Sequence, residues 1–482
     1  MLRLKAFVAA VVVASLSACA AGPDYRRPDI QLPTSYINGV AIVAADNTTD
    51  HWWRGFNDPV LDRVIDRALA QNLELAQVSA RMDQARAAAR EAGSALAPRV
   101  DLNASSSRVH SSLKSPMGEV ANAVGAPRNY DDYSVGAQAS WEIDLFGGLR
   151  RGRDAARADA EVAEVSAAAM RIATAAETAD AYLTLRGLQA RLAVAEEQQE
   201  TQARLAELIR QRAGQGVASN RELQLATGEL EGVRAAIAPL RAAIDGQLNR
   251  LDVLMGMPAG TYRDELSVVA ALPVAPSPSG SVTPADLLRR RPDVAAAERR
   301  LAASSARIGA ALAEYYPHVS LGGLLGFASL GAGSLFTSDA LQAAGVAGLR
   351  WRLFDFGRVD AEVAMAKGRE AEALAAYRAT AIRATEDVET ALSGLLRSRD
   401  ETMARERQIA SLKAARGQTQ DAYQQGALSL LEVLDIDRQL LAASDRLVIA
   451  RTTTARASVA SFRALGGGWS DAQSLTEVAQ KR

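Results

Sequence analysis

The chain carries one sequence pattern twice, and this repetition limits the folds that it can adopt. Residues 141–147 (WEIDLFG) return 210 positions later as residues 351–357 (WRLFDFG). At the same offset, four further residues of the first half have identical counterparts: Gly216 and Gly426, Ser219 and Ser429, Glu222 and Glu432, Gly256 and Gly466. Pro98 corresponds to Pro317 once a difference of nine residues is allowed. Two related halves of about 200 residues each predict a single duplicated architecture.

Proline and serine mark the borders of the two halves. We predict a first structural repeat at 56–271 and a second at 283–466, each containing helices and two strands. The Pro/Ser-rich residues 272–282 form the predicted linker, because this composition is too stiff and polar for a core element. Prolines between 19 and 55 predict an extended N-terminal arm, after which Asp58 and Pro59 are suited to cap and begin a helix. The predicted C-terminal tail is 467–482.

The first residues have the features of an export signal. Arg3 and Lys5 precede an apolar run, 6–16, that is too short for a permanent transmembrane helix. Small residues lead to Cys19, the single cysteine of the chain, as in a bacterial lipoprotein cleavage site. We therefore predict that 1–18 is a lipoprotein signal peptide and that Cys19 carries the lipid. The alternative is an uncleaved anchor with an incidental thiol.

Composition and motif content argue against several classes of protein. A net charge of −1 provides no basic surface for nucleic acid. The three histidines, His51, His110 and His318, do not have the spacing of metal ligands, and no glycine-rich segment has the lysine of a phosphate-binding loop. We expect no enzymatic activity, no metal and no cofactor.

Segments with a period of two predict β-strands. Apolar and polar residues alternate along 133–143, from Val100, from Val319, and through Leu349, Trp351 and Leu353. Strands of about ten residues with one apolar face fit a tilted transmembrane barrel, although a soluble hairpin gives a similar pattern. Four strands cannot close a barrel in lipid, so we expect chains to share one. Two chains would give a filled barrel of about eight strands, whereas three would give about twelve and leave a lumen.

Long segments with a heptad pattern predict coiled-coil helices. Residues 149–212 contain no proline and would extend about 95 Å as one helix. A turn near 212–220 reverses the chain into a second helix that ends near Gly256, and the second half repeats this arrangement. The predicted fold class is mostly α with a small β part: a duplicated repeat of long antiparallel coiled-coil helices plus four transmembrane β-strands per chain.

Several motifs together identify a family resemblance. They are Cys19 with the following 22–25 (GPDY) and Pro28, the 52–59 segment (WWRGFNDP), the two Trp…Phe-Gly junctions, and 426–435 (GALSLLEVLD). In these the chain resembles the outer membrane factor family of TolC-like exit ducts, in its lipoprotein branch that serves multidrug efflux. The resemblance covers nearly the whole mature chain.

This resemblance implies a homotrimer whose β-barrel lies in the bacterial outer membrane and continues into an α-helical periplasmic tunnel. The implied partners are outer membrane lipid, a periplasmic adaptor (membrane fusion protein) and an inner-membrane pump. The implied function is passive conduction of drugs or other small molecules out of the cell. Alternatives are a periplasmic scaffold lipoprotein without a pore, against which the strands argue, or the same duct serving protein secretion or metal-ion efflux. The sequence leaves open the substrate and the class of pump (RND, MFS or ABC).

The turns between the long helices contain the candidate aperture residues. Glu222 and Glu432 each follow a serine by three positions in a capping box, so they serve the helix start, the periplasmic aperture, or both. Asp435 lies one turn beyond Glu432, outside the box, and matches a family position that forms an acidic ring at the narrowest point. The hypothesis is that this ring repels anions and keeps the resting aperture tight.

Tyr423 is a candidate latch residue. It matches a family tyrosine that links neighbouring hairpins, although packing within the coiled coil is an equal alternative. Leu428 occupies the position where an arginine would complete the latch, so the sequence argues against a latch based on charge.

Overall fold

The structure is a computed structural model that describes residues 21–37, 51–276, 283–285 and 290–467. The predicted signal peptide, the predicted lipidation site Cys19, most of the linker and nearly all of the C-terminal tail lie outside the described residues. The chain forms two compact units. Among the described residues, one contains 21–28, 82–162 and 297–377, and the other contains 29–37, 51–81, 163–276, 283–285, 290–296 and 378–467, so each unit draws on both halves of the sequence.

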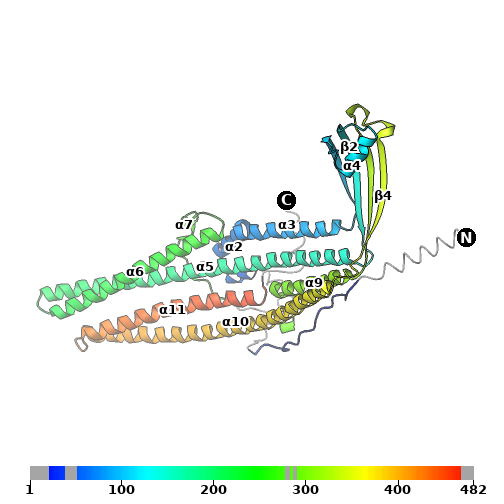
Figure 1. The fold of residues 1–482 in the computed structure, drawn as a ribbon. Coiled ribbons are helices and arrows are strands. Elements are labelled where there is room, and N and C mark those ends of the chain that lie inside the picture. Colours follow the sequence, from blue (N-terminus) through cyan, green and yellow to red (C-terminus); the bar gives the residue numbers. More distant parts are fainter. Residues whose placement is uncertain (1–20, 38–50, 277–282, 286–289, 468–482) are drawn as a thin grey trace. The chain divides into compact units, whose positions relative to one another are not determined.

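The long helices occur in pairs of equal length (Figure 1). Helices α5 (Gly148–Gly214) and α10 (Arg358–Gln424) each contain 67 residues, which corresponds to about 100 Å. Their return helices, α6 (Asn220–Leu254) and α11 (Leu430–Ala464), each contain 35 residues. These helices confirm the predicted duplication and the position of both turns. No helix within the described part of the chain is both long and apolar enough to cross a membrane.

Shorter helices complete each half. Helices α3 (Leu73–Ser94) and α9 (Pro292–Ala313) each have 22 residues and precede the first strand of their half. The other helical elements in the described residues are η1 (Trp52–Phe56), α2 (Pro59–Gln71), α4 (Pro116–Ala123), α7 (Arg263–Leu266), η2 (Ala332–Ser334) and η3 (Ser338–Ala340).

The end of the predicted extended arm is helical. Residues 52–55 belong to the 3₁₀ helix η1, in which Trp52 and Trp53 are each 2% exposed. Trp52 stacks on Phe462 of α11 with the ring centroids 5.4 Å apart. No proline occurs between Pro33 and Pro59, so nothing there imposes an extended backbone, and burial of the two large aromatic rings stabilises the helical turn.

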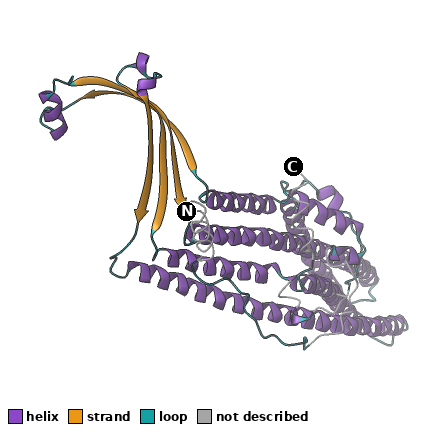
Figure 2. Ribbon diagram, turned by 90° about the vertical axis from the view of Figure 1, so that its right-hand side faces the viewer, coloured by secondary structure: helices purple, strands orange, loops and turns teal. Residues whose placement is uncertain are grey.

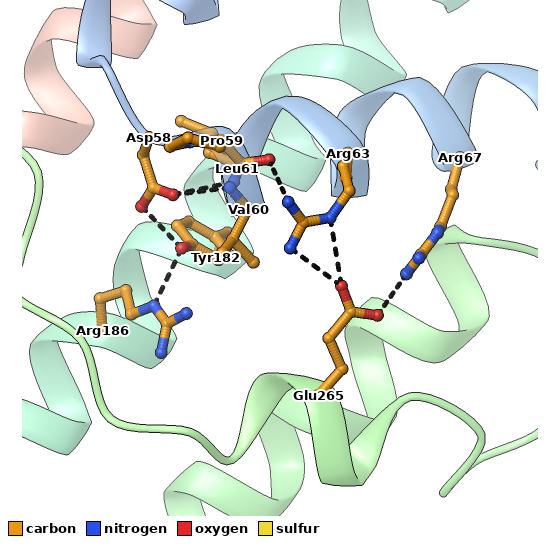
Figure 3. Close-up of polar contacts among 9 residues, drawn as sticks. All are labelled: Asp58, Pro59, Val60, Leu61, Arg63, Arg67, Tyr182, Arg186 and Glu265. Carbon is orange, nitrogen blue, oxygen red and sulfur yellow. Dashed lines mark hydrogen bonds and ion pairs between the residues drawn. The ribbon is translucent and has the colours of Figure 1, made fainter.

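Asp58 begins α2 in the way that the sequence predicts. One carboxylate oxygen accepts hydrogen bonds from the backbone N–H groups of Val60 (2.8 Å) and Leu61 (3.2 Å). The other oxygen accepts the hydroxyl hydrogen of Tyr182 at 2.7 Å, which joins the start of α2 to the middle of α5 (Figure 3). Burial raises the pKa of the Tyr182 phenol, and the hydrogen bond to Asp58 raises it further.

Arginines hold the surrounding elements together (Figure 3). Arg186 is 1% exposed, and its Nε donates to the Tyr182 hydroxyl at 3.0 Å while Nη1 donates to the Val268 carbonyl at 2.6 Å. Arg67 of α2 pairs with Glu265 of α7 at 2.6 Å, and this hydrogen bond holds the pKa of Glu265 below its usual range. The hydrogen bonds to Tyr182 and Val268 offset the cost of burying the Arg186 cation.

Four strands form one antiparallel sheet (Figure 2). Their order in the sheet is β1-β2-β3-β4. Their bounds are Arg99–His110, Asn129–Ile143, His318–Ser329 and Leu341–Arg350. The register places Val100 opposite Ala139, and Val319 opposite both Ile143 and Leu349. Strands β1 and β4 are the edges of the sheet, so their outer backbone groups are available for strands of other chains.

The predicted fourth strand extended too far. Trp351 and Leu353 were expected within it, but β4 ends at Arg350, because Arg350 pairs with His318, the first residue of β3. Trp351 Nε1 instead donates to the Tyr315 carbonyl at 3.0 Å. Trp141 makes the equivalent bond to Leu96 at 3.0 Å. Tyr315 follows Leu96 by 219 residues, the offset that also separates Pro317 from Pro98, so the two tryptophans have equivalent roles.

Candidate functional site

Glycine allows each long hairpin to reverse direction. Gly216 and Gly426 have φ angles of +72° and +76°, which residues with a Cβ rarely adopt. In each turn the next N–H group bonds back over five residues, from Val217 to the Arg212 carbonyl and from Ala427 to the Ala422 carbonyl, at 2.9 Å in both cases. This pattern is a Schellman motif, which ends a helix without leaving its last carbonyl groups unpaired.

Both predicted capping carboxylates are engaged at the start of the return helices. Glu222 Oε2 accepts hydrogen bonds from the Ser219 backbone N–H (2.7 Å) and hydroxyl (2.9 Å). Glu432 Oε2 accepts the same two bonds from Ser429, each at 2.6 Å. Hydrogen bonds from these serines hold the pKa of both carboxyl groups below the usual range, so both are ionised at neutral pH.

Asp435 lies on α11 beyond the capping box, as predicted. Its carboxylate accepts hydrogen bonds from Arg438 Nη2 at 2.8 Å and from Gln439 Nε2 at 2.6 Å. Its side chain is 49% exposed and that of Arg438 is 67% exposed. An ion pair that is this accessible stabilises the helix little, so Asp435 remains available to other ions or residues.

The two hairpin tips pack against each other within one chain. Apolar side chains from all four long helices form a common cluster there. Its buried members are Ala206 and Ile209 of α5, Ala226 and Leu230 of α6, and Leu430 and Leu434 of α11, with Tyr423 of α10 packed on the side. A shared apolar cluster means that one tip cannot move far without exposing side chains of the other.

Tyr423 has an arginine partner, which the sequence analysis did not find. Arg212, in the last turn of α5, donates from Nη1 to the Tyr423 hydroxyl at 2.9 Å. Leu428 is indeed not a charged partner, but the required cation comes from the other hairpin, 211 residues away in the sequence. The only sequence signal was a basic residue in the last turn of a helix, which also has a simpler explanation through the helix dipole.

A second ion pair near the tips was also missed. Asp437 of α11 is 3% exposed and accepts a hydrogen bond from Arg416 Nε of α10 at 2.5 Å. The pair joins the two helices of the second hairpin. Because Asp437 is buried, loss of Arg416 would be costly, since it would leave the carboxylate charge without compensation.

The described residues contain no group of three histidine, cysteine, aspartate or glutamate side chains that could hold a metal ion. The candidate site is the pair of hairpin tips, and the duplicated helices and the four-stranded sheet each agree with a sequence comparison. The profile of the outer membrane efflux protein family matches residues 64–257 and 283–467. The chain belongs to this family.

Individual relatives match almost over their full length. The chain is 30% identical to the pyoverdine export outer membrane protein OpmQ of Pseudomonas putida over 94% of this chain and 96% of the relative. It is 31% identical to the outer membrane protein OprJ of Pseudomonas aeruginosa over 98% of each. The solved structure of the outer-membrane channel OprN superposes with a TM-score of 0.84 at 31% identity, covering 94% of this chain and all of that one.

These matches confirm the predicted family, fold class, location and role. The protein is a trimeric channel of the outer membrane that extends into the periplasm. It is the exit component of a tripartite efflux system and works with a periplasmic adaptor and an inner-membrane pump. Members of this family are channels and not enzymes.

Proposed function

We propose that the channel conducts small organic molecules passively and that acidic side chains narrow its periplasmic aperture. Asp435 carries this proposal, because its accessible carboxylate lies on the first turns of α11 next to the tip. Glu432 and Glu222 add ionised carboxylates at the two helix starts. Each of these residues occurs three times in a trimer, so their fields add at the aperture and disfavour anions.

The pump, and not the wall of the channel, selects the molecule that is transported. One relative is named for pyoverdine export, which agrees with small molecules as cargo. Protein secretion and metal-ion efflux remain the competing cargoes. We infer that the channel itself catalyses no reaction, so the energy for transport comes from the inner-membrane partner.

We further propose that Cys19 is acylated after removal of residues 1–18, and that the lipid anchors the N-terminal arm in the outer membrane. The support is the signal-like sequence and the single cysteine at its end. Mass spectrometry of the N-terminal peptide from purified protein tests this step: an acylated residue 19 is expected, and an unmodified chain beginning at residue 1 contradicts it.

Planar-bilayer recording of the purified trimer tests the aperture. The wild type should give small, cation-selective steps, and the Glu432→Ala/Asp435→Ala variant should give larger and less selective ones. The Glu401→Ala/Glu406→Ala variant is the matched control, since it removes two exposed acids of α10 that lie away from the turn. Equal conductance and selectivity in all three proteins would refute the acidic aperture, and the absence of steps in all of them would refute the channel.

A further inference from the structure

A groove lies between α5, α6 and α11, within one compact unit. Its volume is about 570 Å³, which is within the range of about 300–1,000 Å³ that is typical of small-molecule sites. Leu188 and Val194 of α5, Val233 and Leu240 of α6, and Leu441 of α11 provide its apolar wall.

Small side chains border the groove beside the packed seam of α6. Gly232, Ala236 and Ala243 line it from α6, and Ala442 lines it from α11. A Cβ atom on Gly232 would have no neighbour within 4 Å. Gly232 and Ala236 are exposed, whereas the neighbouring Val233 and Ile237 are buried in the seam, so the small residues leave the groove open to solvent.

Glu229 is the charged group of the lining on which the binding argument depends. Arg191 and Asp445 both line the groove and neutralise each other. Arg191 Nε and Nη2 donate hydrogen bonds to the two Asp445 carboxylate oxygens at 2.6 and 3.2 Å. Arg438 lies at the solvent-exposed side of the lining, beside Asp435. Glu229 of α6 is half-buried in the lining and has no ion-pair or hydrogen-bond partner for its side chain in the described part of the chain. The groove therefore combines an apolar wall with one uncompensated carboxylate.

We propose that this groove binds an amphiphilic cation, a small molecule with one positively charged nitrogen and an apolar body. The nitrogen pairs with Glu229, and the body covers the apolar wall formed by the three helices. Such a ligand gains from desolvation and from a charge-assisted contact at the same time. An anion would gain less, because Asp445 neutralises Arg191, and Arg438 is mostly exposed, so water screens its charge. A bound ligand would contact both hairpins of one chain.

Ethidium is a suitable probe, because it is a small aromatic cation whose fluorescence rises in an apolar site. The full-length trimer in lipid nanodiscs should bind it saturably, once per chain, above the signal of empty nanodiscs. Glu229→Gln should weaken this binding about tenfold, which corresponds to roughly 1.4 kcal/mol. The matched control is Glu231→Gln, since Glu231 is exposed, pairs with Arg234 and does not line the groove.

A second variant tests whether binding needs the open volume of the groove, whereas Glu229→Gln tests the charge. Gly232→Leu fills the groove from a helical position that tolerates leucine, and it should abolish saturable binding while the protein remains trimeric in size-exclusion chromatography. Three results would each overturn the proposal: no saturable binding to the wild type, equal affinity of the wild type and Glu229→Gln, or unchanged binding to Gly232→Leu. None of them affects the proposed channel function, because the assay measures no transport.

Discussion

Replacing Tyr423 with phenylalanine removes a single oxygen atom that connects the two hairpins of each chain. Arg212 Nη1 then loses the acceptor that lies 2.9 Å away, while the aromatic ring and its place beside the apolar cluster remain. A hydrogen bond to a charged group contributes roughly 1.5–3 kcal/mol. Because both side chains are half-buried, we use the lower value, about 1.5 kcal/mol per chain.

The trimer multiplies this effect. If the closed arrangement needs all three bonds and the open one needs none, the substitution destabilises the closed state by about 4.5 kcal/mol, which shifts the ratio of open to closed channels by roughly a thousandfold. Planar-bilayer recording should show this shift as long-lived steps of higher conductance, which are rare in the wild type. Arg212→Gln should act in the same direction.

A double-mutant cycle and a matched control separate this link from general destabilisation. The Arg212→Gln/Tyr423→Phe variant should open no further than either single variant, because both remove the same contact. Arg451→Gln breaks a 2.8 Å ion pair with Glu406, which joins the two helices of one hairpin, so it should leave conductance unchanged. The reasoning fails if Tyr423→Phe has the wild-type conductance, or if the two substitutions have additive effects.

Three further predictions concern stability. Trp52→Ala should destabilise the folded protein by about 3–5 kcal/mol, seen as a lower melting temperature by circular dichroism, since it leaves a cavity beside Phe462; an unchanged melting temperature would contradict this packing. Gly426→Ala should lower stability by about 1–2 kcal/mol because of its positive φ, whereas the control Gly368→Ala, in the open interior of α10, should not; equal effects of the two would contradict a role for φ. The lowered pKa of Glu222 means that its contribution to the cap is present above the unfolded-state pKa of about 4.3 and is lost as pH falls through the folded-state pKa. The protection factor of the Ser219 amide, which corrects for the intrinsic pH dependence of exchange, should therefore fall in acid in the wild type and not in Glu222→Gln; a wild-type protection factor that does not change with pH would contradict the cap.

The predictable part of this fold is the part that local sequence determines. Helix lengths and turn positions follow from the proline-free heptads and from glycines such as Gly216 and Gly426, because these residues act through their own backbone. Capping by Glu222 and Glu432 is predictable for the same reason, since both partners lie within four residues of each other.

The remaining features depend on contacts that are distant in sequence. The contact between Arg212 and Tyr423 spans 211 residues, and no local pattern marks it. The end of β4 at Arg350 depends on where its neighbour begins, and so alternation alone placed Trp351 in the strand. Tryptophan burial in η1 depends on Phe462, which lies near the other end of the chain.

Because each chain is duplicated, the number of hairpin tips at the periplasmic end of the trimer is twice the number of chains. Three chains with two similar hairpins each present six tips of nearly the same shape, because both turns use the same glycine, serine and glutamate at an offset of 210 residues. Their chemistry is less symmetric: the position of Asp435 is Leu225 in the first half, and the position of Tyr423 is Ala213. A partner that recognises only backbone shape therefore meets six equivalent sites, whereas one that recognises charge meets three.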